Sequence, residues 1–216
     1  MNRKGIKLME KKLQSNLVYR TFLFCVLGIL YIIFSSFLNS QIFYYINYVD
    51  VFGLFFILIF IIFNQNRGFF FKKMTLDFFK HSKNYIYVFI GYLSILFSNW
   101  ALLFFPVSYP STETEIIHIT SIPLSILFVI GLVLLAPIWE EMLMKRLILD
   151  FTRVYLPFWM GMIITSLIFA LLHNVNLPQR IFIFILSIVT CIVYKKTDSL
   201  YGPIFIHSLW NFTSLG

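Results

Sequence analysis

Charged residues are scarce in this chain, since Asp, Glu, Lys and Arg together make up only 12% of its 216 residues. Soluble domains carry about twice that share, so the composition excludes an ordinary soluble domain. Hydrophobic residues make up 60% of the chain and aromatic residues 20%. This balance is typical of a polytopic membrane protein.

Cysteine is also scarce, because only Cys25 and Cys191 occur and both lie in apolar segments. This number and spacing exclude a disulfide framework and a recognisable cysteine metal site. We interpret both as small buried hydrophobic residues. The HExxH signature of zinc proteases is missing from the sequence, and no internal repeat of the kind found in inverted-repeat transporters stands out.

Seven apolar segments predict an all-α fold, a polytopic transmembrane helical bundle. A helix needs about 17–25 residues to cross a hydrocarbon core of about 30 Å. The expected spans cover residues 21–38, 43–63, 84–106, a fourth from about 121 that carries two adjacent Glu residues, 157–173, 181–194 and 199–214. Gly202-Pro203 predicts a kink in the last span. Residues 1–20 form a basic lead-in, and no small-residue cleavage site follows, so we expect a retained helix and not a removed signal peptide.

The basic residues predict the topology. With a cytoplasmic N-terminus and alternating spans, 16 of the 17 Lys and Arg residues fall on the cytoplasmic side, and only Arg180 lies outside. The positive-inside rule therefore predicts a multi-pass protein of the cell membrane. We interpret the net charge of +8 as topology signals and contacts with the lipid bilayer, not as nucleic-acid binding. We divide the chain into residues 1–120, with the lead-in and three helices, and residues 121–216, which hold the candidate site.

Two adjacent carboxylates, Glu140 and Glu141, end an apolar stretch that contains no charge. A charged residue inside a membrane costs roughly 2.5–3.5 kcal/mol on insertion scales, so such a residue is a functional-site hypothesis. Three polar partners lie in later apolar segments: His173, His207 and Asn211. We expect these five residues to meet in one helical bundle.

Residues four apart share one face of a helix. Phe169 is therefore expected beside His173, and His207 beside Asn211. Lys145 is expected beside Glu141, where it can neutralise the carboxylate. The candidate residues reach a common depth near mid-membrane only if Lys145 and Arg146 lie inside the bundle or face a water-filled cavity.

Peptide hydrolysis needs an activated water, a proton donor for the leaving amine and stabilisation of the tetrahedral oxyanion. A carboxylate in an apolar site can act as general base and then as acid, and a histidine can share that work. An Asn amide and a His N–H are suitable oxyanion donors. Two His and one Glu also form a known catalytic zinc ligand set, so spacing alone leaves a metal-free and a zinc mechanism open.

These motifs resemble the CAAX prenyl protease and bacteriocin-processing (CPBP, or Abi) family of intramembrane proteases. A Glu pair followed by Arg, typically after a Pro, is matched within residues 137–146. Phe-x-x-x-His is matched by Phe169 and His173, and His-x-x-x-Asn by His207 and Asn211. The resemblance covers about residues 121–214.

One position departs from the family pattern. The family's Arg falls on Lys145, and Arg146 takes the usual Gly position. Lys can still pair with Glu141, although it lacks the bidentate fork of Arg.

The resemblance implies an intramembrane peptidase. Glu140 would activate water, helped by His173, while His207 and Asn211 would form the oxyanion site and Glu141 would be auxiliary. The implied substrates are membrane-associated peptides or proteins: prenylated CAAX tails in eukaryotes, and peptides of bacteriocin self-immunity or peptide signalling in bacteria. The composition favours a bacterial peptide. We favour a glutamate-type protease without a cofactor over a zinc metalloprotease.

Two other classes of function stay open. The first is a non-catalytic membrane immunity or scaffold protein that keeps the fold without turnover. The second is an ion-coupled transporter that uses the same Glu and His residues to move protons or cations.

Overall fold

The computed structural model describes residues 71–102, 104, 129–173 and 175–215. Every regular element in these residues is a helix, which confirms the predicted all-α class for this part of the chain. The first two predicted spans lie outside the described residues. The seven-span layout, its orientation and the division at residue 120 stay predictions.

The described elements follow one another as a series of helices. They are η2 (Leu76–Lys80), α4 (Ser82–Leu102), η3 (Gly131–Leu135), α6 (Ala136–Glu141), η4 (Met142–Leu149), α7 (Asp150–Tyr155), α8 (Phe158–Leu172), α9 (Leu177–Thr197) and α10 (Tyr201–Thr213). The η2 turn is a 3-10 helix, whereas η3 and η4 are π-helical. Residues 129–155 are helical without a break. The Glu pair therefore lies in one long helix that contains the two π-helical segments η3 and η4.

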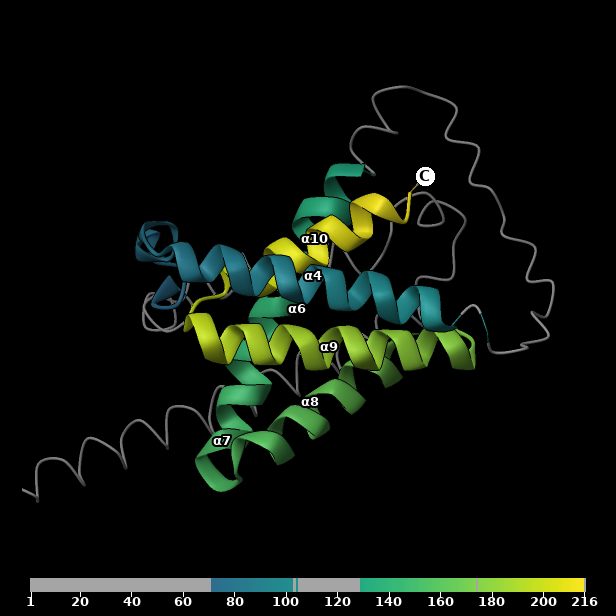
Figure 1. Ribbon diagram of the computed structural model, residues 1–216. Helices are drawn as coiled ribbons and strands as arrows, with labels where there is room; N and C mark the ends of the chain where they lie inside the picture. The colour runs from purple at the N-terminus through teal and green to yellow at the C-terminus, as the bar shows by residue number, and fades with distance from the viewer. Residues whose placement is uncertain (1–70, 103, 105–128, 174, 216) are drawn as a thin grey trace, which may run out of the picture.

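α9 lies at the centre of this arrangement and packs against α4, α8, α10 and η4 (Figure 1). The helical segment 129–155 crosses behind α4 and α9 in this view. Gly91 allows α4 to approach its neighbours closely, because a Cβ there would lie 2.6 Å from Ile206 of α10 and 3.2 Å from Val193 of α9. Small residues at helix contacts are typical of membrane helix packing.

Among the described residues, two helices are long and apolar enough to cross a membrane, α4 and α9, and α8 is a shorter apolar helix. The predicted third span, 84–106, corresponds to α4, and the predicted fifth span, 157–173, to α8. α8 and α10 contain 15 and 13 residues, fewer than the roughly 20 that a perpendicular span needs.

The predicted sixth span, 181–194, was too short. α9 begins at Leu177 because Asn176 caps it: the Asn176 side-chain oxygen accepts a hydrogen bond from the Gln179 backbone N–H, and a proline lies in the first turn. The helix ends before Asp198, which adopts the left-handed conformation with φ of 51°. The polar residues of the first turn had the composition of a loop, although they form the start of the helix.

The predicted kink at Gly202-Pro203 was wrong. α10 begins at Tyr201, so Pro203 lies in the first turn of the helix. The backbone N–H groups of a first turn have no intrahelical acceptor, and proline loses nothing there. The pair starts the helix and does not interrupt it.

Candidate active site

The Glu pair lies at the junction of two kinds of helix. Glu140 and Glu141 are the last two residues of α6, and π-helical segments precede and follow α6. Both carboxylates are buried. Short π-helical stretches within α-helices occur frequently at functional sites, because the wider turn re-aims the side chains.

Glu141 bridges two elements through its two carboxylate oxygens. Lys145 Nζ lies 3.0 Å from Glu141 Oε2, and His207 Nδ1 lies 3.0 Å from Glu141 Oε1. The Lys145 side chain is 0% exposed and that of Glu141 is 1% exposed. The sequence predicted the Lys145 pair from its spacing, whereas the bridge to His207 of α10 comes from tertiary structure.

The candidate residues were expected to share one depth in the membrane only if Lys145 and Arg146 lie inside the bundle. Both side chains are buried in the structure. Arg146 forms an ion pair with Asp150 one turn later, and the Tyr194 hydroxyl of α9 donates to the same carboxylate at 2.9 Å. Both basic residues therefore stay inside the described helices instead of marking the end of a span.

The hydrogen bond to Glu141 fixes the proton on His207. An ionised carboxylate only accepts, so Nδ1 of His207 must donate to Glu141. The second ring nitrogen, Nε2, lies 3.7 Å from Glu140 Oε2. The structure therefore brings Glu140, Glu141 and His207 together in one buried cluster. Glu141 orients the ring as the aspartate of a catalytic triad orients its histidine.

His173 joins this cluster through Phe169. The His173 ring packs edge-on against Phe169 with centroids 4.7 Å apart, and the His207 ring lies 5.9 Å from the same phenyl ring. Nδ1 of His173 lies 2.7 Å from the Phe169 carbonyl oxygen, which only accepts, so Nδ1 carries a proton and Nε2 of the neutral ring has a lone pair. His173 is the residue that follows the last turn of α8.

Asn211 lies one turn after His207 and binds the backbone of the Glu-bearing helix. Its amide nitrogen donates to the Leu132 carbonyl at 2.9 Å. The two following residues that could donate to the Leu132 carbonyl within the helix do not do so. The Ala136 N–H bonds to the Gly131 carbonyl, and Pro137 has no N–H. Asn211 thus satisfies a carbonyl that Pro137 leaves without an intrahelical donor, while its second amide N–H stays available to an oxyanion.

This relation predicts coupling between Asn211 and Pro137. We expect Asn211→Ala to lower the free energy of unfolding by about 1–3 kcal/mol, because the Leu132 carbonyl loses its donor. In a Pro137→Ala background the new N–H can supply that carbonyl, so the same change should cost about half as much or less. A double-mutant cycle of unfolding in detergent measures the difference. Equal costs in both backgrounds would contradict the assignment.

Sequence reasoning missed the polar surroundings of Cys191. This residue is buried as predicted, but its thiol lies near Lys145 and near the hydroxyls of Ser166 and Ser187. A signal was present, since Ser187, Thr190 and Cys191 share one face of α9 by their spacing. Cys25 lies outside the described residues.

The donor set matches a zinc site only in part. His173 and His207 each hold a proton on Nδ1 through a carbonyl or carboxylate, as histidine ligands of metals commonly do. However, the described residues contain no group of three or more His, Cys, Asp or Glu side chains placed to hold a metal ion. The cluster as it stands does not fit zinc.

Comparison with known proteins gives the family of this segment. Residues 122–213 match the family model described as type II CAAX prenyl endopeptidase Rce1-like. This segment is therefore similar to the Rce1-like family. The match confirms the resemblance to the CPBP family, and Rce1-like proteins are membrane-embedded endopeptidases.

A curated relative is a protein of Escherichia coli described as "Uncharacterized 24.3 kDa protein". It is 27% identical over 124 residues, which cover 55% of this chain and 57% of that protein. The chain therefore spans little more than half the length of that relative. No solved structure matches the chain.

Proposed function

We propose that the Rce1-like segment is a glutamate-type intramembrane endopeptidase that cleaves membrane-associated peptides or proteins in a multi-pass protein of the cell membrane. The observation that carries this proposal is the buried bridge from Lys145 through Glu141 to His207, which leaves Glu140 3.7 Å from the ring. Glu141 thus holds the His207 ring beside Glu140, which is the proposed site of proton transfer.

In the proposed reaction, Glu140 accepts a proton from water, with His173 assisting through its Nε2 lone pair. The resulting hydroxide attacks the scissile carbonyl carbon, and the carbonyl π electrons move to the oxygen. When the tetrahedral intermediate collapses, the C–N bond breaks and Glu140 returns its proton to the leaving amine. General acid–base catalysis of this kind contributes typically 10²–10⁴-fold.

His207 and Asn211 are the proposed donors to the oxyanion. Because Nδ1 of His207 is committed to Glu141, its Nε2 can donate only when the ring is an imidazolium. Asn211 would offer its second amide N–H. The proposed substrates are bacterial peptides, from bacteriocin self-immunity or peptide signalling, in preference to prenylated tails.

Purified protein in detergent tests the proposal. Wild type and Glu140→Ala are incubated with a fluorogenic library of membrane-anchored peptides, with and without a zinc chelator. Cleavage by the wild type alone, unaffected by the chelator, supports the glutamate mechanism. Cleavage lost to the chelator and restored by zinc overturns it in favour of a metalloprotease.

The two rival functions have their own readouts in the same preparations. A scaffold shows no cleavage, and its Glu140→Ala variant still protects cells against a bacteriocin. A transporter produces proton or cation flux in liposomes, which a peptidase does not require. Either result, without peptide cleavage, overturns the proposal.

A further inference from the structure

A basic hollow lies between the first turns of α4 and the end of α9. It has a volume of about 380 Å³ and is lined by Lys80, His81, Ser82, Lys83, Asn84, Tyr87 and Lys196. That volume is within the range of roughly 300–1,000 Å³ found for small-molecule sites. None of these described lining residues is acidic.

The charges around the hollow favour an anion. Lys83 and Lys196 are exposed, and no ion pair of either is found in the part of the chain that the structure describes. Lys80 lies 2.7 Å from Asp77, and this hydrogen bond lowers the pKa of the Asp77 carboxyl, so the Lys80 charge is largely balanced. The first turn of α4 contains no acidic residue, so the positive end of the helix dipole adds to the two lysines.

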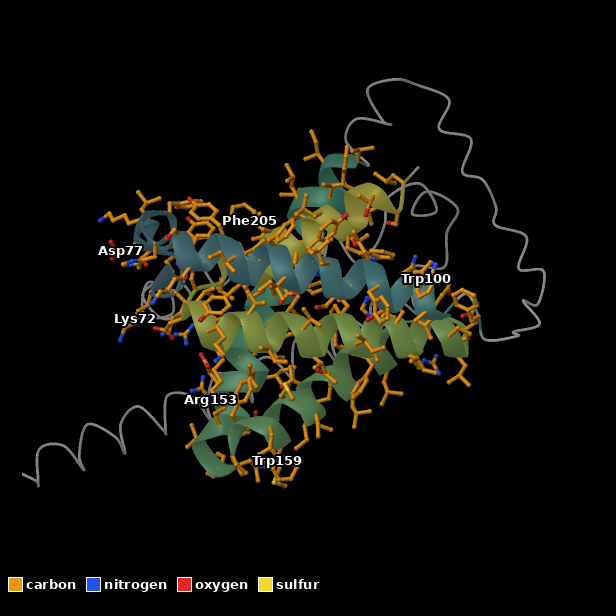
Figure 2. All side chains as sticks on the ribbon, in the orientation of Figure 1. Lys72, Asp77, Trp100, Arg153, Trp159 and Phe205 are labelled. Atoms are coloured by element: carbon orange, nitrogen blue, oxygen red, sulfur yellow. The ribbon has the colours of Figure 1, made fainter. Side chains whose placement is uncertain are left out.

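The hollow lies at the ends of α4 and α9, both of which are long and apolar enough to cross a membrane. Figure 2 shows Lys72, Asp77 and Arg153 at this end of the molecule and Trp100 toward the far end of α4. The ends of spanning helices lie at the level of lipid headgroups, where anionic lipids attract basic residues. The position favours a phosphate that belongs to a lipid.

An exposed apolar stripe on α4 begins next to Lys83, which precedes Ile86 by one helical turn. Exposed large hydrophobic residues recur along one face of the helix at Tyr85, Ile86, Phe89, Ile90 and Leu93. Their spacing of three to four residues continues the face away from the basic end. A free phosphate ion has no apolar part that could pack on this surface, whereas the acyl chain of a phospholipid packs against apolar side chains.

We propose that this hollow binds the phosphate group of an anionic phospholipid, with an acyl chain along the exposed stripe of α4. Lys83 and Lys196 provide the charge, and the positive end of the α4 dipole adds to it. The site is separate from the Glu–His cluster, so the proposal does not depend on the peptidase activity.

Native mass spectrometry of the full chain in detergent micelles tests this site. The probes are phosphatidylglycerol, phosphatidylcholine with the same acyl chains, and inorganic phosphate as a competitor. We expect wild type to bind phosphatidylglycerol at least ten-fold more tightly than phosphatidylcholine. Equal binding of the two lipids, or displacement of the lipid by millimolar phosphate, would overturn the proposal of an anionic-lipid site.

Matched variants locate the binding. Lys83→Gln with Lys196→Gln should weaken phosphatidylglycerol binding at least five-fold. Lys72→Gln with Arg153→Gln removes the same charge outside the hollow and should change binding less than two-fold. Ser82→Asp places a carboxylate in the hollow at a helix start that tolerates acidic residues, and should weaken binding in the same direction. Equal losses in the hollow and control pairs would overturn the location.

Discussion

Glu140→Gln is expected to lower kcat for peptide cleavage at least 100-fold while the melting temperature stays within a few degrees of wild type. The amide has nearly the shape of the carboxylate, but it cannot accept a proton from water. Glu140 is buried beside His207, which is the position that the proposed general base requires. The measurements are steady-state cleavage of one peptide and thermal unfolding in the same detergent.

Asp77→Asn is the matched control for this change. Asp77 is an exposed carboxylate paired with Lys80, outside the buried cluster. It should leave kcat within about two-fold of wild type, because exposed ion pairs contribute little. Substantial cleavage by purified Glu140→Gln would remove Glu140 from the reaction.

The second large effect is expected from Lys145→Met, which removes the cation beside Glu141. Breaking a buried ion pair by deleting one partner typically costs about 3–5 kcal/mol, because the other charge stays buried without compensation. Both side chains are almost fully buried here, so solvent cannot replace the lost partner. We expect the free energy of unfolding, measured by denaturation in detergent, to fall by that amount.

Adding Glu141→Gln to Lys145→Met separates stability from activity. With both charges removed, most of the lost stability should return, because no unpaired buried charge is left. Cleavage should stay low, because an amide oxygen can still accept from Nδ1 of His207 but carries no negative charge to stabilise the imidazolium form of the ring. A double variant as active as wild type would show that the charge of Glu141 is not needed for cleavage, and one less stable than Lys145→Met would contradict the ion-pair reasoning.

The sequence by itself determined the class of the fold and the chemical groups of the site. Scarce charge and long apolar segments predicted helices, and three short motifs identified Glu140, His173 and His207 within the apolar segments. Contacts within one helix follow from spacing, so the pairing of Lys145 with Glu141 and of Phe169 with His173 was predictable. The catalytic roles of these residues stay predictions that the variants above test.

Tertiary structure decided what each polar group binds. Glu141 and His207 are 66 positions apart, and only the crossing of α10 with the Glu-bearing helix brings Nδ1 to the carboxylate. Pro137 implied a carbonyl without an intrahelical donor, but the donor, Asn211, comes from a distant helix. Spacing along one helix is set by the local backbone geometry, whereas the angle and register between helices depend on side-chain packing over the whole bundle.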